Sequence, residues 1–459
     1  MSDRDSKSDI RGGRLAPEAY ARNFADAHPS LAPNQALIES DRCYFCHDAP
    51  CIQACPTQID IPSFIRKIAT GNVKGAAHDI LKQNVMGAVC ARVCPTEVLC
   101  EGACVRNDQE HKPVAIGRLQ RHATDWLFDR HIQLFERGPD SGKRVAVVGG
   151  GPAGLSCAHR LSMLGHSVTV FEARDKLGGL NEYGVAAYKV TGLIAQREVE
   201  YLLEIGGIET RLGQRLGRDV VLSRLRHDYD AVFLGIGLGA VNALGVGEPT
   251  TGVFDAIAYI EKLRQAPDLS QMPVGRGVVV IGGGMTAIDI ASQVKRLGAE
   301  DVTIVYRRGP ENMGASDKEQ AWAQTSGVRI KHWARPLRLL AREGMLTAVE
   351  FEHTRLDQQG RLTGDGDKFI VAADMVFKAI GQVLIKDGLD GNIDVLEMKA
   401  GRIAVDAERR TSISGVWAGG DCVAGGQDLT VVAVEDGKRA ALSIDRHLRA
   451  DSKTEALHG

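Results

Sequence analysis

Residues 144–155 read RVAVVGGGPAGL, and residues 277–288 repeat that pattern as GVVVIGGGMTAI. Each stretch begins with an apolar run typical of a buried strand, turns on glycines and then opens a helix. A second apolar run follows each of them, VTVFEA at 168–173 and VTIVYR at 302–307. Strands that alternate with helices in this way predict βαβ units built on parallel sheets. We therefore expect an α/β protein with two Rossmann-like dinucleotide-binding domains.

The first glycine turn has the spacing of a dinucleotide-binding fingerprint. Gly149, Gly151 and Gly154 follow a strand and precede a helix, so backbone N–H groups at the helix start can hold a pyrophosphate. Glu172 follows about twenty residues later, where a carboxylate accepts hydrogen bonds from a ribose diol. A purely structural strand–turn–helix is the alternative interpretation.

The second glycine turn favours a phosphorylated nucleotide. Gly282, Gly284 and Ala287 occupy the fingerprint positions, and alanine is an accepted variant at the last one. Tyr306 stands where the first unit has its acid, and Arg307 and Arg308 follow it. Two guanidinium groups without an acid favour a 2′-phosphate, hence NADP(H), unless both arginines are simply solvated.

The segment from Gly415 to Ala441 has no counterpart in the second unit, so it is expected to complete the first. It contains Gly420-Asp421 ahead of a helix predicted from Leu429. A short acid beside glycines can hydrogen-bond the ribityl chain of a flavin. Because the segment that completes the first unit comes after the second unit in the sequence, the second unit is predicted to be inserted in the first. The expected domains are an N-terminal domain at 1–140, whose cysteines are described next, an FAD-binding domain at 141–250 and 380–459, and an NAD(P)-binding domain at 251–379.

Eight of the ten cysteines lie within the segment 43–104. They form the runs Cys43-x2-Cys46-x4-Cys51-x3-Cys55-Pro and Cys90-x3-Cys94-Pro-x4-Cys100-x3-Cys104. Compact runs that end in Cys-Pro are typical of ferredoxin-like clusters, and two [4Fe–4S] clusters need about eight ligands. Two zinc sites and a set of disulfides are the alternatives. Helical patterns at 34–41, 75–84 and 116–134 predict an α-helical domain around them.

The composition excludes several classes of function. The chain has 459 residues, 52 glycines, a formal net charge of −2 and a pI of about 6.7. Neither a nucleic-acid binder nor a membrane protein is expected from that charge balance and from the absence of a long apolar run. The polar N-terminus lacks a secretory pattern, so a cytoplasmic location is expected. Cys157 and Cys422 are isolated in sequence, which argues against a disulfide reductase.

The cysteine-rich block resembles a known family. CYFCHDAPCIQACPTQIDIPSFI at 43–65, GAVCARVCPTEVLCEGACVRN at 87–107 and IGRLQ at 116–120 resemble dihydropyrimidine dehydrogenase, and specifically the small flavin-containing subunit of the bacterial enzyme. The resemblance covers nearly the whole chain. The glutamate synthase small subunit is a close cousin with similar cysteine spacing, but it tends to carry Glu where Gln120 stands.

The resemblance implies a set of ligands and cofactor contacts. One cluster would use Cys43, Cys46, Cys51 and Cys104, and the other would use Cys55, Cys94, Cys100 and Gln120. Cys90 would then be spare, whereas the residue count alone prefers Cys90 to Gln120. FAD would contact Gly149, Gly151, Pro152, Ala153, Gly154, Glu172, Gly179, Leu180, Lys189, Gly420 and Asp421. The nicotinamide nucleotide would contact Gly282, Gly284, Met285, Thr286, Ala287, Arg307, Arg308, Ala379, Ile380 and Gly381.

The resemblance also implies an activity without a catalytic side chain of its own. NAD(P)H would reduce FAD, and the two clusters would pass electrons to a partner FMN subunit that reduces uracil or thymine, or runs in reverse. Bacterial members use NADH, whereas the arginine pair resembles an NADPH site, so both nucleotides stay open. The alternatives are the glutamate synthase small subunit, a ferredoxin-coupled NADP reductase subunit, and a non-catalytic subunit with a decayed flavin site.

Overall fold

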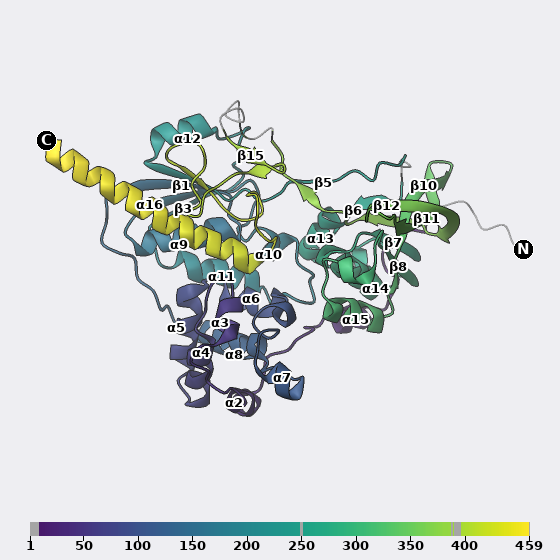
Figure 1. Cartoon of the computed structure of the whole chain (residues 1–459), viewed down its shortest axis with the longest axis horizontal. Coiled ribbons are helices and arrows are strands. Elements are labelled where there is room, and N and C mark those ends of the chain that lie inside the picture. Colours follow the sequence, from purple (N-terminus) through teal and green to yellow (C-terminus); the bar gives the residue numbers. More distant parts are fainter. Residues whose placement is uncertain (1–8, 248–250, 387–388, 390–395, 459) are drawn as a thin grey trace, which may run out of the picture. The chain divides into compact units, whose positions relative to one another are not determined.

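The computed structural model describes residues 9–247, 251–386, 389 and 396–458 (Figure 1). They belong to two compact units. Unit 1 contains residues up to 27, 183–191 and 240–382, and unit 2 contains residues 28–182, 192–239 and those from 383 onward. Among the described helices, none has both the length and the apolar composition needed to cross a bilayer.

The cysteine-rich part of unit 2 is helical, as predicted. Its helices are α2 (Pro33–Asp41), α3 (Pro50–Ala54), α4 (Ile61–Ala69), α5 (Val73–Gln83), α6 (Gly87–Val93), η1 (Thr96–Val98), α7 (Arg106–Glu110) and α8 (Ile116–Phe128). Proline in the first turn starts α2, α3 and α4, where its missing N–H costs no hydrogen bond. The helix predicted at 75–84 is present as α5, and its apolar residues Ala76, Ile80 and Leu81 are at most 1% exposed.

Helix α8 is shorter than the sequence indicated. The expected helix continued to Leu134, whereas the structure ends it at Phe128. His131 takes a left-handed backbone conformation with φ 50°, which a continuing α-helix does not allow.

The flavin-type fold of unit 2 is a five-stranded parallel sheet in the order β17-β4-β1-β2-β3. Gly437 of α16 packs so closely on α9 that a Cβ there would lie 2.1 Å from the Ala153 carbonyl oxygen, and Figure 1 shows the two helices side by side. Strand β17 joins this sheet although the strands of unit 1 lie between β4 and β17 in the sequence. The predicted insertion of the second nucleotide-binding domain in the first is therefore confirmed. The elements are β1 (Arg144–Val148), α9 (Pro152–Met163), β2 (Ser167–Phe171), α10 (Leu180–Tyr183), α11 (Ile194–Leu203), β3 (Ile208–Arg211), α12 (Leu222–Asp228), β4 (Ala231–Leu234), β15 (Met398–Lys399), β16 (Arg402–Ile403), β17 (Val416–Ala418) and α16 (Thr430–His458).

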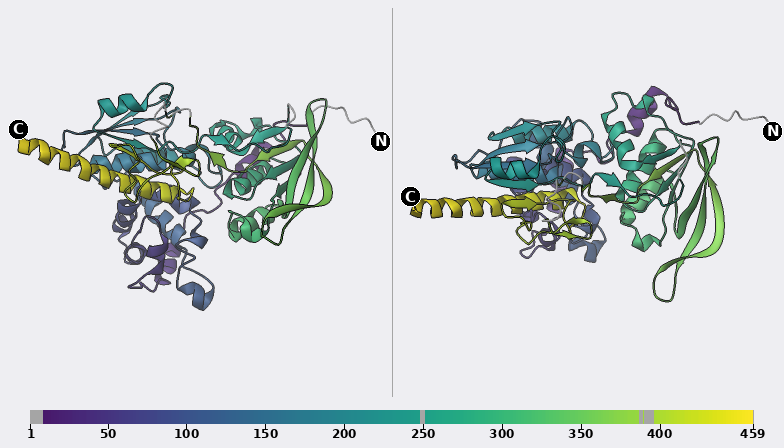
Figure 2. Two further views of the ribbon diagram at one scale, coloured as in Figure 1. Left: turned by 45° about the horizontal axis from the view of Figure 1, so that its top comes forward. Right: turned by 90° about the horizontal axis from the view of Figure 1, so that it is seen from above.

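Unit 1 has a second five-stranded parallel sheet, in the order β6-β13-β7-β8-β9, and an antiparallel ribbon β10-β11-β12 that Figure 2 shows clearly. Residues 9–27 also belong to unit 1, and Tyr20 and Phe24 of α1 are part of its apolar core. The expected domain at 1–140 wrongly included them. The elements are α1 (Pro17–Asn23), β5 (Ala240–Val241), β6 (Val253–Asp255), α13 (Ala256–Gln265), η2 (Leu269–Gln271), β7 (Gly277–Ile281), α14 (Met285–Arg296), β8 (Asp301–Val305), η3 (Pro310–Asn312), α15 (Asp317–Thr325), β9 (Arg329–Lys331), β10 (Ala334–Arg342), β11 (Met345–Leu356), β12 (Leu362–Ala372), β13 (Met375–Lys378) and β14 (Gln382–Val383), whose last residue falls in unit 2.

Candidate functional site

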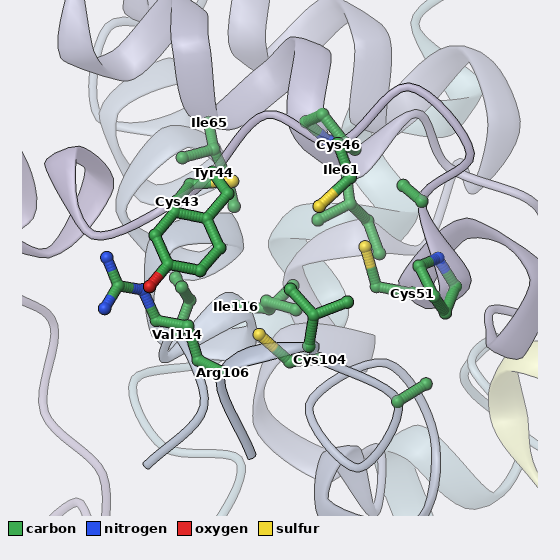
Figure 3. Close-up of a pocket in the computed structure, with 15 residues that line it drawn as sticks. Cys43, Tyr44, Cys46, Cys51, Ile61, Ile65, Cys104, Arg106, Val114 and Ile116 are labelled. Atoms are coloured by element: carbon green, nitrogen blue, oxygen red, sulfur yellow. The ribbon is translucent and has the colours of Figure 1, made fainter. Parts of the chain in front are cut away.

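Four cysteines surround a hollow in the helical part of unit 2, which we call hollow I. Its lining includes Cys43 and Cys46 from the loop after α2, Cys51 from α3 and Cys104 from the turn before α7. Figure 3 shows the sulfur atoms of Cys46, Cys51 and Cys104 pointing toward a common space, with Cys43 beside Tyr44. The structure thus brings together one of the two ligand sets predicted from the resemblance.

The loop that carries Cys43 and Cys46 has the backbone shape of a metal-binding knuckle. Phe45 between them has φ 52°, and its backbone N–H donates to the Cys43 sulfur at 3.4 Å. Burial raises the pKa of the Cys43 thiol, and this N–H donation opposes the shift in part. The Arg66 guanidinium lies 4.8 Å from the Phe45 ring centre and stabilises this strained turn from outside.

A second hollow, hollow II, lies next to the first, because Ile61 lines both. Cys55, Cys94, Cys100, Cys90 and Gln120 all contribute to its lining. The Gln120 amide nitrogen donates to the Gly87 carbonyl at 2.7 Å, so its carbonyl oxygen is the atom available as a ligand. The structure therefore places both Cys90 and Gln120 at this site.

Burial and neighbouring groups raise the pKa of Cys51, Cys94 and Cys100 and so favour their neutral thiol forms in the absence of a cation. Burial, followed by the neighbouring Cys43 and Cys104, raises the pKa of Cys51 to about 12. A hydrogen bond with Cys90 and burial raise the pKa of Cys94, while burial and Glu101 raise that of Cys100. Several buried thiolates together need positive charge to compensate them. The donor set therefore fits a group that carries several cations.

The spacing of the cysteines favours a cluster over a single ion. All ten are free, so the disulfide interpretation is not supported. Within the described ranges, no three His, Cys, Asp or Glu side chains come together as ligands of one metal ion. Four thiolates on one zinc would each lie about 2.3 Å from it. Each hollow has at least four cysteines in its lining, which is the number of thiolates that an iron–sulfur cube binds.

The choice between Gln120 and Cys90 can be tested by paired substitutions. We expect Gln120→Ala to damage the cluster of hollow II, because it removes the fourth ligand that the resemblance implies. Cys90→Ser is expected to keep both clusters. Iron content and the EPR spectrum of the reduced protein distinguish the variants. Normal clusters in Gln120→Ala together with iron loss in Cys90→Ser would assign the ligand to Cys90.

Hollow II adjoins the flavin-type fold directly. Val431, at the start of α16, is part of its lining. The neighbouring Thr430 hydroxyl donates to the Asn181 side-chain oxygen at 2.8 Å, and the Asn181 amide lies 3.6 Å from the Met86 sulfur. Lys438 of α16 donates to the Thr57 carbonyl at 3.1 Å. These contacts join the two parts of unit 2 beside hollow II.

Glu198 of α11 caps the helix that leads to Cys94. Its Oε1 accepts from the backbone N–H groups of Ala88 and Val89, at 2.8 and 3.2 Å. Burial raises the pKa of Glu198 to about 8, although the two backbone donors and Arg92 oppose the shift. The carboxylic acid is therefore favoured in the folded chain over the carboxylate.

The raised pKa predicts a pH-dependent difference between wild type and Glu198→Gln. A folded-state pKa above the unfolded value of about 4.3 means that the neutral acid stabilises the fold at low pH, and that this contribution is lost as pH rises through about 8. The glutamine side chain would keep the acceptor and would not titrate. The melting temperature of Glu198→Gln minus that of wild type should therefore increase between about pH 6 and about pH 9. A difference that stays constant across this range would contradict the shift.

The first glycine turn forms a cradle that only glycine allows. A Cβ on Gly154 would lie 1.9 Å from the Gly149 carbonyl oxygen, and one on Gly179 would lie 2.7 Å from the Gly151 Cα. Glu172 accepts from the Gly150 N–H at 2.7 Å and from the Arg174 N–H at 2.9 Å. The helix α9 begins after Gly151 without a side-chain cap, so its first N–H groups are free to bind an anion.

Gly420 and Asp421 lie against this cradle. A Cβ on Gly420 would be 3.0 Å from the Ala153 Cβ. Asp436 of α16 accepts from the Gly420 N–H at 2.9 Å and pairs with Arg409 at 2.5 Å. Burial and Asp428 raise the pKa of Asp421 to about 6, with Arg402 opposing. The geometry brings Gly420, which precedes the predicted acid, to the first turn of α9, and the flavin contact of Asp421 stays a prediction.

The second glycine turn is built in the same way. A Cβ on Gly282 would lie 2.1 Å from the Ala379 carbonyl oxygen, so the predicted strand end 379–381 lies beside the turn. Helix α14 begins after Gly284, also without a side-chain cap. Arg307 and Arg308 are exposed after β8, and no carboxylate of the described residues pairs with their guanidinium groups. Met285, Thr286 and Ala287 form the first turn of α14.

Lys189 is held in unit 1 by two carboxylates. Its Nζ lies 2.7 Å from Asp289 and 2.6 Å from Glu319. Burial lowers the pKa of Lys189, but Asp289, Tyr188 and Glu319 outweigh it and the pKa is raised. The flavin contact predicted for Lys189 stays a prediction.

Sequence reasoning missed several residues that shape these sites. Asp436, Arg409, Glu198 and Asn181 act through contacts with residues far away in the chain. For Asp436 the sequence offers one signal. It is an acidic residue in a predicted helix that is rich in small residues, EDGKRAA at 435–441.

Comparison with known proteins agrees with this geometry. Residues 20–132 match the family model of dihydropyrimidine dehydrogenase domain II, 4Fe-4S cluster, and residues 142–437 match that of pyridine nucleotide-disulphide oxidoreductase. The NAD-dependent dihydropyrimidine dehydrogenase subunit PreT of Salmonella typhimurium is 35% identical over 93% of this chain and 98% of its own length. The glutamate synthase [NADPH] small chain of Escherichia coli K12 is 34% identical over 92% of this chain and 93% of its own length. Thioredoxin reductase of T. acidophilum shares the fold, with a TM-score of 0.53 at 20% identity over 66% of this chain and 99% of that one.

Fold and site together define an NAD(P)H-oxidising flavin iron–sulfur oxidoreductase with a 4Fe-4S domain and an FAD/NAD(P)-binding domain. The chain belongs to the pyridine nucleotide-disulphide oxidoreductases, and within them to the flavin 4Fe-4S oxidoreductases that include PreT and the glutamate synthase small chain.

Proposed function

We propose that this chain is the electron-input subunit of a dihydropyrimidine dehydrogenase. It takes electrons from NAD(P)H and supplies them, through two [4Fe–4S] clusters, to a partner FMN subunit that reduces uracil or thymine to the 5,6-dihydropyrimidine or runs in reverse. The observation that carries this proposal is hollow II, where Cys55, Cys94, Cys100 and Gln120 share one lining with Val431 of the flavin-type fold.

The residues of the chain have distinct roles in this function. The turns at Gly149–Gly154 and Gly282–Ala287 hold the diphosphates of FAD and the nucleotide at helix starts. FAD, when bound, converts a hydride into single electrons that iron–sulfur clusters accept. The cysteines of hollows I and II, which share Ile61 in their linings, would hold the clusters that take up these electrons. No side chain acts as a nucleophile or general acid.

Pyrimidine reduction is supported by two features. PreT covers nearly the same length as this chain, and its name assigns it to dihydropyrimidine dehydrogenase as a subunit. Gln120 resembles the pyrimidine family, since the glutamate synthase small subunit tends to carry Glu at this position. Gln120 is part of the lining of hollow II. We place the complex in the cytoplasm.

We propose that Arg307 and Arg308, which are exposed after β8 and so follow the strand next to β7, contact a nucleotide bound at the second turn. Guanidinium groups without a competing carboxylate favour a 2′-phosphate, whereas the PreT relative is named as NAD-dependent. NADH and NADPH are therefore both candidate donors, and titration with each decides between them.

The second candidate function is that of a glutamate synthase small chain or a ferredoxin-coupled NADP reductase subunit. The 34% identity to the Escherichia coli small chain over 93% of its length favours the former. The two candidates differ in the partner and in its product, not in the chemistry of this chain.

The partner assay tests the proposal. The isolated chain should oxidise NAD(P)H with artificial acceptors and leave uracil unchanged. Uracil or thymine reduction should begin only when an FMN partner subunit is added. Glutamate formation on adding a glutamate synthase large subunit, with no gain from the pyrimidine partner, would assign the second function. Robust uracil turnover by the isolated chain would refute the division of labour.

A further inference from the structure

Asn84 is a buried amide with half of its hydrogen-bonding capacity unused. It ends α5 and is 0% exposed. Its Oδ1 accepts from the Met86 N–H at 3.1 Å, and its backbone N–H donates to the Ile80 carbonyl at 2.9 Å. Its Nδ2 has no hydrogen-bond partner among the described residues. A buried donor without an acceptor is costly, and each such group in a folded protein calls for an explanation.

The position of Asn84 explains why its Nδ2 has no partner within the chain. Asn84 lines hollow II together with Cys55, Cys94 and Cys100. Because the hydrogen bond with Met86 fixes Oδ1, the free Nδ2 is the polar atom that Asn84 can offer to an occupant of the hollow. An iron–sulfur cube brings sulfides and thiolates, which are hydrogen-bond acceptors. The unpaired amide and the acceptor-rich group thus complement each other.

We propose that Asn84 is a positioning residue whose Nδ2 donates a hydrogen bond to a sulfur of the cluster in hollow II and raises its reduction potential. The inference rests on the proposed function, which puts a cluster there. A donated N–H stabilises the more negative, reduced cluster, and hydrogen bonds to sulfur are one of the factors that set such potentials. Asn84 therefore makes the cluster beside the flavin-type fold a better electron acceptor than it would be without this donor.

Three variants test this role by EPR-monitored redox titration. Asn84→Asp keeps the acceptor for Met86 and replaces the donor by an oxygen, while Asn84→Leu removes both in a neutral side chain. Asn72→Asp is the matched control, because Asn72 caps the other end of the same helix, is exposed, and accepts from the Gly75 N–H at 2.9 Å. Aspartate preserves such a cap.

Both Asn84 variants should keep their iron and lower the potential of one cluster. Loss of one hydrogen bond to a charged group is expected to change the one-electron equilibrium by about tenfold, or about 59 mV. The potential of the other cluster should not move, and Asn72→Asp should match wild type. Unchanged potentials in Asn84 variants that retain two clusters would overturn the inference while leaving the proposed function intact. A wild-type protein with only one cluster, or none, would overturn both.

A measurement on the wild-type chain covers the case in which the variants lose iron. Protein labelled with 15N in asparagine alone should show a 15N hyperfine coupling on a reduced cluster in pulsed EPR. Absence of that coupling, with both clusters reduced, would overturn the hydrogen bond independently of any substitution.

Discussion

Gly154→Ala is expected to yield protein that has lost nearly all of its FAD. The added Cβ would lie 1.9 Å from the Gly149 carbonyl oxygen and 3.1 Å from a Val147 methyl group. Gly149 cannot yield easily, because its φ of 101° and its hydrogen bond to the Phe171 carbonyl fix it at the end of β1. Overpacking of this kind costs about 1–3 kcal/mol, which weakens binding by up to about a hundredfold. The flavin-to-protein ratio, read from the visible spectrum, measures the effect.

A matched glycine variant separates this clash from a general effect of alanine. Gly247→Ala meets no atom within 4 Å and should retain its flavin. Iron content should stay normal in both variants, because neither glycine lines hollow I or hollow II. Full flavin occupancy in Gly154→Ala would contradict the assignment of the first turn as the FAD site.

Cys51→Ser is expected to remove the cluster of hollow I and to stop electron delivery to the partner. Cys51 lies on α3, and its sulfur is one of the four that surround hollow I. About half of the iron should be lost, since each of two clusters holds four irons. NAD(P)H should still reduce the flavin. Partner-dependent turnover should fall by more than the roughly tenfold to hundredfold that loss of an outer-shell partner of a metal site costs.

Tyr44→Phe is the control for the same hollow. It changes the residue next to Cys43, removes only a hydroxyl that donates to Gln109 at 2.8 Å, and keeps the ring under the Arg106 guanidinium. Iron and turnover should match wild type. If Cys51→Ser retained all of its iron and its turnover, hollow I would not be a cluster site.

The parts of the fold that local sequence determines were predictable. The strand–turn–helix units follow from glycine turns in which Gly154 and Gly282 leave no room for a side chain, as the close approach of Gly282 to the Ala379 carbonyl oxygen shows. The insertion of one unit into the other followed from the unmatched segment around Asp421, and the strand order confirms it. The cysteine spacing indicated two ligand groups, and the structure places each group around a hollow.

What the sequence did not reveal depends on long-range packing. Glu198 caps α6 across more than a hundred residues of chain, and Asp436 reaches Gly420 only because α16 packs on α9. Asn84 looked like an ordinary helix end until the structure showed its amide in hollow II. Residues 9–27 pack in unit 1 through Tyr20 and Phe24. The local sequence pattern does not indicate whether this segment packs against the core of unit 1 or that of unit 2.

Anaerobic titration of the purified chain with NADH and, separately, with NADPH tests the central claim most directly. We predict that at least one nucleotide bleaches the flavin absorbance and then produces the EPR signals of two reduced [4Fe–4S] clusters. Colourless protein that contains zinc, with neither iron nor flavin, would contradict the account.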